Sequence, residues 1–283
     1  MRTFGNTTCR VLAAALVMGW IGFIPRNACA QVTVYDTGFE APEWAAGQPV
    51  SGQNGWEAGN GGTIGPLAGV ISTSNPKSGS QSLKVSGSDL VYVASDGLFE
   101  GVYRPAAGVD TSGWNFLRIS ADVRLDGPLS GNTPADDDYS ANVNVYNATE
   151  GLAEIYLSSN GMVVYDDGTS NWVYGPTVDL GVYHHLAIDM YLSGLYSNFF
   201  IDGKYLGTLS IPGSIATDKT VAVNLANLAY ADFPGFRHSD YTSNFDNYQI
   251  SASTPEPGTL ALVSVFGMAG LAAIRQRRSK SIQ

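Results

Sequence analysis

Apolar and polar residues alternate in short runs along the middle of the chain, between residues 31 and 254. A period of two residues places one face of a strand in a core and the other face in water. Runs that are also rich in β-branched and aromatic residues, and that lie between turn residues, indicate strands. They predict twelve strands: Val32–Tyr35, Gln81–Val85, Leu90–Ala94, Phe116–Leu125, Tyr139–Tyr146, Ala153–Leu157, Gly161–Tyr165, Tyr183–Tyr191, Tyr196–Ile201, Lys204–Ser210, Thr220–Leu228 and Ser243–Ser251.

The alternation also predicts which side chains face the core. In Phe116–Leu125, Leu117 and Ile119 are expected inside, whereas Arg118 and Asp122 are expected on the outer face. No helical period persists in this part of the chain, and no long repeat is evident. The pattern therefore predicts one all-β sandwich of two antiparallel sheets spanning Gln31–Thr254.

Two segments between the predicted strands carry turn signals. Asp202-Gly203 separates two apolar runs, which predicts a hairpin whose turn requires positive φ at both residues. The glycine-rich segment Gly47–Gly69 predicts a long surface loop with Trp56 tucked beneath it.

The first thirty residues have the pattern of a secretory signal peptide. Arg2 and Arg10 lie before the apolar run Val11–Ile24. Ala28-Cys29-Ala30 then provides the small residues of a cleavage site, so the mature chain is expected to begin at Gln31. A buried or membrane-spanning helix is the alternative interpretation. Both cysteines of the chain lie within these residues, so the mature protein is expected to contain no disulfide.

The last residues carry a second signal. Pro255-Glu256-Pro257 is followed by the apolar run Gly258–Ile274, which is just long enough to predict a transmembrane helix, and then by Arg275, Arg277 and Arg278. Basic residues after the run predict that this end stays in the cytoplasm while the body of the protein lies outside the inner membrane.

This order of features, at residues 255–283, resembles the PEP-CTERM sorting signal of Gram-negative bacteria. The resemblance implies recognition by an exosortase, a membrane-embedded protease, with transient anchoring in the inner membrane. Cleavage near the Pro-Glu-Pro triplet would then release the protein or transfer it to the cell surface. An ordinary C-terminal membrane anchor is the alternative.

Composition and charge limit the partners of the chain. It has 33 glycines and 11% aromatic residues, as expected for a protein of strands and turns. Lys and Arg number 15 against 25 Asp and Glu, which gives a net charge of −10. Nucleic-acid binding is not expected, because it requires clustered basic residues.

The body also resembles the concanavalin A-like lectin/glucanase (laminin-G-like) jelly roll. The resemblance is carried by Tyr183–Ile188 followed by Phe199–Gly203, and by three shorter matches: Gly38–Glu40, Ser78–Leu83 and Phe245–Asn247. It implies a jelly-roll topology. It does not by itself imply a function, because one fold carries many functions.

A catalytic site is not evident in the sequence. A glucanase of this fold is expected to carry Glu-x-Asp-x-x-Glu on one strand, which no strand here has. Glu154 and Asp189 are lone carboxylates on their predicted strands. The protein is therefore expected not to be an enzyme, with a glycan-active hydrolase of the same fold, or a purely structural or adhesive protein, as alternatives.

Carbohydrate binding is the favoured chemistry of the body. Aromatic faces pack against sugar rings, and amide groups bind hydroxyls. Such residues are predicted on adjacent strands near one concave sheet: Tyr139, Asn142, Asn144, Tyr146, Trp172 and Tyr174. The sequence thus predicts an exported surface or matrix protein with weak binding to an extracellular polysaccharide; ordinary core or surface packing of the same residues is the alternative.

Calcium is the one metal that the sequence favours. In jelly rolls that bind carbohydrate, a Ca²⁺ ion often joins the first and last strands, and the resemblance places the ligands at Glu40, Asp246 and the main chain near Gly79. Polar strand ends that bind no ion are the alternative.

Overall fold

The computed structural model describes residues 31–60, 69–86, 98–104, 110–127, 139–147, 150–168, 171–216, 218–219, 221–229 and 242–253. They belong to one compact unit, Gln31–Thr254. Within these residues no helix is long and apolar enough to cross a membrane. Both predicted terminal signals, and the predicted strand Leu90–Ala94, lie outside the described residues.

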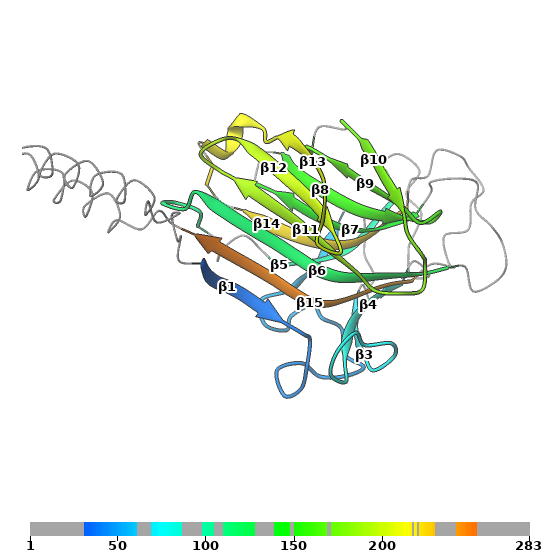
Figure 1. The fold of residues 1–283 in the computed structure, drawn as a ribbon. Coiled ribbons are helices and arrows are strands. Elements are labelled where there is room, and N and C mark those ends of the chain that lie inside the picture. The colour runs from blue at the N-terminus through cyan, green and yellow to red at the C-terminus, as the bar shows by residue number, and fades with distance from the viewer. Residues whose placement is uncertain are drawn as a thin grey trace, which may run out of the picture. The chain divides into compact units, whose positions relative to one another are not determined.

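The fold is the expected all-β sandwich of two antiparallel sheets. The first sheet, here the β6 sheet, has the order β13-β12-β11-β6-β15-β4-β3, with β1 also paired to β15. Figure 1 shows β6, β11 and β15 side by side in this layer. Its strands are β1 (Gln31–Thr37), β3 (Val70–Ser72), β4 (Ser82–Ser86), β6 (Phe116–Asp126), β11 (His184–Tyr191), β12 (Tyr196–Ile201), β13 (Lys204–Ser210) and β15 (Thr242–Ser253).

The second sheet, here the β7 sheet, packs against the first. Its order is β10-β9-β8-β7-β14-β5-β2. Its strands are β2 (Glu57–Asn60), β5 (Leu98–Arg104), β7 (Tyr139–Tyr146), β8 (Gly151–Ser158), β9 (Met162–Asp166), β10 (Val173–Thr177) and β14 (Ala222–Ala229). One short 3-10 helix, η3 (Gly213–Ala216), follows β13.

Most predicted strands are confirmed within a few residues, and four strands were missed. β2, β3 and β10 are short strands at sheet edges. Gly interrupts β2, Gly and Pro interrupt β10, and β3 has only three residues, so no run of alternation marks them. β5 was missed as well, although it has seven residues. The segment Gly47–Gly69 is not one continuous loop, because β2 lies within it. Trp56 is buried beside it, as expected.

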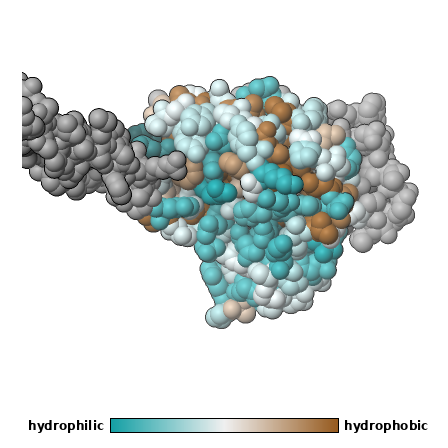
Figure 2. Space-filling view, in the orientation of Figure 1, coloured by the Kyte–Doolittle hydropathy of each residue, from teal (hydrophilic) through white to brown (hydrophobic). Residues whose placement is uncertain are grey.

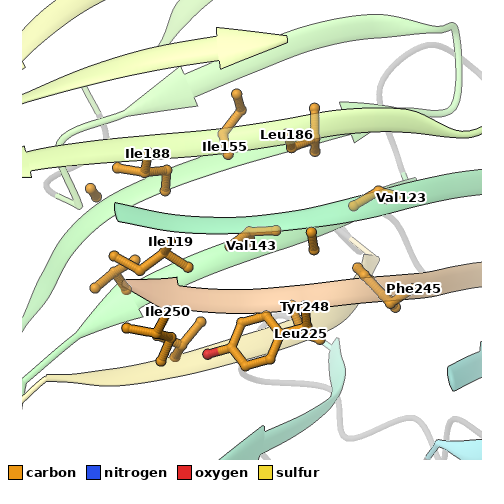
Figure 3. Close-up of a cluster of buried hydrophobic side chains, with 14 of the residues drawn as sticks. Ile119, Val123, Val143, Ile155, Leu186, Ile188, Leu225, Phe245, Tyr248 and Ile250 are labelled. Atoms are coloured by element: carbon orange, nitrogen blue, oxygen red, sulfur yellow. The ribbon is translucent and has the colours of Figure 1, made fainter. Parts of the chain in front are cut away.

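The core is made by the alternating apolar residues of the two facing sheets. Figure 3 shows Ile119, Leu186 and Ile250 of the β6 sheet together with Val143 and Ile155 of the β7 sheet. All five side chains are at most 1% exposed. The inward positions predicted along β6 are confirmed, because Leu117 and Ile119 are buried, and Arg118 on the outer face is partly exposed. Asp122, also expected on the outer face, is only 8% exposed, because His185 and Asn247 bind its carboxylate.

Local geometry fixes the register of the hairpin between β12 and β13. Asp202 and Gly203 have φ values of 48° and 75°, the two positive values that the predicted turn requires. Asp202 also accepts a hydrogen bond from the backbone N–H of His185 (2.9 Å), which ties the turn to β11.

Candidate functional site

A row of polar residues crosses the outer face of the β7 sheet. Glu154 on β8 lies directly opposite Asp166 on β9 and opposite Asn144 on β7. The backbone register continues the row from Asn144 to Asn224 on β14 and to Tyr103 on β5. Neighbouring strands are about 4.8 Å apart, so the row presents polar positions at the spacing of a sheet.

Glu154 and Asp166 form the centre of this face. Glu154 is 8% exposed and Asp166 is 3% exposed, so both carboxyl groups are nearly covered. Asn142, two residues from Asn144 on β7, donates from Nδ2 to Oε1 of Glu154. Asp166 Oδ1 accepts from the backbone N–H of Gly168 (2.5 Å). Each acid is thus held by its own hydrogen bond, and the register of β8 and β9 places the two opposite each other.

Burial determines the protonation state of the pair. Removal from water, together with the negative charge of Asp166, raises the pKa of Glu154 to about 8, although the hydrogen bond from Asn142 acts in the opposite direction. Burial and the charge of Asp167 also raise the pKa of Asp166, whereas the Gly168 N–H lowers it. At neutral pH Glu154 is therefore a neutral acid beside a second carboxyl group.

One buried acceptor in this cluster has no partner. Oδ1 of Asn142 is buried and accepts no hydrogen bond from the described residues. A buried unpaired acceptor is unfavourable by about 1–3 kcal/mol.

Directly opposed strand positions suit two-carboxyl chemistry. Their Cβ atoms are about 4.5–5.5 Å apart. Retaining glycosidases use two carboxyl groups about 5–5.5 Å apart, one of them protonated. Glu154 and Asp166 occupy directly opposed positions of this kind, and burial raises the pKa of both carboxyl groups.

The predicted carbohydrate residues lie in the same sheet. Asn142 is fully buried, and Asn144 and Tyr146 are partly exposed on the same face of β7. Tyr174, on β10, is 59% exposed and lies opposite Val164 of β9, and Trp172, just before β10, is 39% exposed. Tyr139 begins β7 opposite Ala229, and its side chain lies outside the described part.

The three predicted calcium ligands come together at the other sheet. Glu40 Oε1 accepts from the backbone N–H groups of Ser80 (2.8 Å) and Gln81 (2.9 Å). Asp246 Oδ2 accepts from the N–H groups of Lys77 and Ser78, both at 2.9 Å. The segment 77–81 is thus held by two carboxylates; we call this arrangement the loop clamp.

The donors of the loop clamp take up oxygens that a metal would use. Burial tends to raise the pKa of Glu40, but its hydrogen bonds from Gln81 and Ser80 outweigh this effect and lower the pKa below its usual value. Among the described residues, no three His, Cys, Asp or Glu side chains are grouped to hold a metal ion. The clamp fits backbone N–H donors better than Ca²⁺, and calcium stays a prediction.

The sequence reasoning missed Asp166 as the partner of Glu154. Each acid is alone on its strand, so a search along one strand does not find the pair. The hairpin register brings them together: Leu157 pairs with Val163, and three positions further along Glu154 pairs with Asp166. The turn Ser158–Gly161, with φ of 80° at Gly161, carries the signal that sets this register.

The comparisons with known proteins give solved structures only. No family model matches the chain, and no curated protein matches it. The chain is similar to a family 7 alginate lyase, A1-II′, at 12% identity over 66% of this chain and 82% of that chain, with a TM-score of 0.46. An alginate lyase from Klebsiella pneumoniae has 11% identity over 64% and 83%, with a TM-score of 0.46.

A sialidase is similar over 72% of this chain, at 12% identity and with a TM-score of 0.46, but the chain spans only 17% of the sialidase. At these identities the likeness concerns the fold alone. Even so, the prediction that the protein is not an enzyme is wrong on this comparison, because the structures with a similar fold include alginate lyases. The pattern Glu-x-Asp-x-x-Glu lies on a single strand, whereas Glu154 and Asp166 lie opposite each other on two strands.

Proposed function

We propose that the protein is an exported glycan-active enzyme whose site is the outer face of the β7 sheet. The observation that carries the proposal is the pair Glu154 and Asp166, opposed across β8 and β9, with Glu154 held neutral to about pH 8. A neutral carboxylic acid next to a second carboxyl group is the arrangement that hydrolyses glycosidic bonds.

The roles of the two acids follow from their surroundings. Glu154 is the more strongly perturbed acid, and it donates its proton to the glycosidic oxygen as the leaving group departs. Asp166, held by the Gly168 N–H, stabilises the positive charge that develops on the sugar ring or attacks the ring carbon. The amide of Asn142 orients Glu154 through its hydrogen bond.

The rest of the face supports binding of a glycan chain. Asn144 and Tyr146 offer polar and aromatic contacts next to the pair, and Tyr174 and Trp172 provide exposed rings at the β10 edge. Because the carboxyl pair itself is nearly covered, the proposal requires the residues around it to move before one sugar unit can reach it, while neighbouring units bind the surrounding residues.

Release of reducing ends from a panel of polysaccharides tests the proposal. Glu154→Gln and Asp166→Asn should each lower the rate by at least about 100-fold. Glu150→Gln, in the turn before the same strand, should keep the rate. The wild-type rate should fall as the pH rises above about 8, when Glu154 loses its proton. Full activity of Glu154→Gln, in a protein that still folds, would contradict the proposal.

We also propose that the protein is exported through residues 1–30 and sorted by an exosortase through residues 255–283. The arginine-rich end after the apolar run supports orientation with the body outside the inner membrane. An extracellular polysaccharide would then be the substrate that the enzyme meets at the cell surface.

A further inference from the structure

A surface pocket lies on the β6 sheet, away from the Glu154 and Asp166 pair. Its volume is about 310 Å³, and it is lined by Ser74, Asn75, Lys84, Asp126, Thr242 and Asn244. Lys84 on β4 pairs with Asn244 on β15, and Asn244 pairs with Arg124 on β6. Figure 2 shows the lower part of the molecule, where β3 and β4 lie, as mostly hydrophilic.

Among the described residues that line this pocket, the one acid is already bound. Asp126 Oδ1 accepts from Nε of Arg124 at 2.7 Å, and its Oδ2 accepts from Nδ2 of Asn244 at 2.9 Å. Lys84 is partly buried and forms no ion pair with any described residue. The unmatched charge of the described pocket is therefore the positive charge of Lys84.

The nearby acids are engaged as well. Asp122 accepts hydrogen bonds from His185 and Asn247, and Asp246 accepts from backbone N–H groups in the loop clamp. Lys77, two residues after Asn75 of the pocket, places its Nζ 5.9 Å from the centre of the Tyr183 ring. None of these contacts supplies a carboxylate to Lys84.

One wall of the pocket is held in place without a ligand. The hydroxyl of Tyr183 donates to the backbone oxygen of Asn75 at 2.7 Å, and the N–H of Ser74 donates to Oγ of Ser72 at 3.0 Å. Asn75 has a positive φ of 55°, a conformation that asparagine tolerates better than most residues. A wall of this kind limits the loss of conformational entropy on binding.

We propose that this pocket binds the carboxylate of an acidic sugar unit, a uronic acid within a polysaccharide. A volume near 300 Å³ is at the lower end for ligand pockets, which suits one sugar unit rather than a larger ligand. Lys84 pairs with the carboxylate, while Ser74, Asn75 and Thr242 provide groups for ring hydroxyls. The site lies on the opposite sheet from the proposed catalytic face, so it is a second point of attachment for the same class of polymer.

Calorimetry with galacturonic acid oligomers and the full chain tests the site. Lys84→Met should weaken binding at least tenfold, and Lys84→Arg should keep most of it. Lys204→Met, which removes an exposed lysine from β13, is the matched control and should bind as the wild type does. Oligomers whose carboxyl groups have been reduced to alcohols should bind at least tenfold more weakly to the wild type.

The outcomes separate this site from the proposed function. A loss of oligomer binding in Lys84→Met, with wild-type binding in Lys204→Met, assigns binding to the pocket, whatever the rates of reducing-end release by Glu154→Gln and Asp166→Asn. Equal binding by Lys84→Met and the wild type would overturn the inference. Competition by acetate or inorganic phosphate as strong as that of the sugar acid would also overturn it, since the pocket would then bind bare anions.

Discussion

At the scale of single residues, Glu154 couples the stability of the protein to pH. Its pKa is about 8 in the folded state against 4.5 for an ordinary glutamate. The folded state therefore keeps the proton that the unfolded state loses, and the stabilisation present below pH 4.5 is lost as the pH rises through about 8. The slope is at most about 1.4 kcal/mol per pH unit for this one group.

Glu154→Gln should remove this pH dependence. Glutamine keeps the size and the hydrogen bond from Asn142 without a titrating proton, so urea unfolding at pH 5, 6.5 and 8 should give a flatter profile than the wild type. Some dependence should remain, because the pKa of Asp166 is raised too. Glu43→Gln, at an exposed position, should leave the profile unchanged. Parallel profiles for Glu154→Gln and the wild type would show that Glu154 is not neutral in the fold.

At the scale of elements, the strand limits could be predicted where apolar and polar residues alternate regularly. β7, β12 and β13 have the residue limits that were predicted, because each has regular alternation and turn residues at its ends. β3, with three residues, is too short for a period to appear. The pair Glu154 and Asp166 depends on how β8 pairs with β9, a property of two strands and the turn between them.

The loop clamp is a contact between elements whose partners are separated by up to 169 positions in the chain. Since two backbone N–H groups occupy one oxygen of Glu40 and two others occupy one oxygen of Asp246, the clamp needs no ion. We expect the Tm of the full chain to be the same in calcium and in EDTA, as measured by calorimetry. A fall of several degrees in EDTA would instead support the calcium ion predicted from the sequence.

At the scale of the whole molecule, composition and the alternation of apolar residues predicted the fold class. They did not predict which polar residues come together on one face of a sheet. Two packed sheets need only alternating apolar residues, and Ile119, Val143 and Leu225 meet between the layers as such residues must. Which polar residues share an outer face depends on the order of strands in each sheet. The sequence alone did not give the order β9-β8-β7-β14, and this order creates the polar row.

Processing of the two chain ends is the prediction that concerns the protein as a whole. If both terminal signals act as expected, mass spectrometry of the exported protein should find Gln31 at the N-terminus and no residues of the apolar run 258–274. Pro255→Ala with Pro257→Ala should leave the unprocessed form in the inner membrane, because the triplet is the part that the sorting enzyme would recognise. Pro212→Ala, within the sandwich, is the control and should be processed normally. Normal processing of the triplet variant would instead contradict recognition of the triplet by a sorting enzyme.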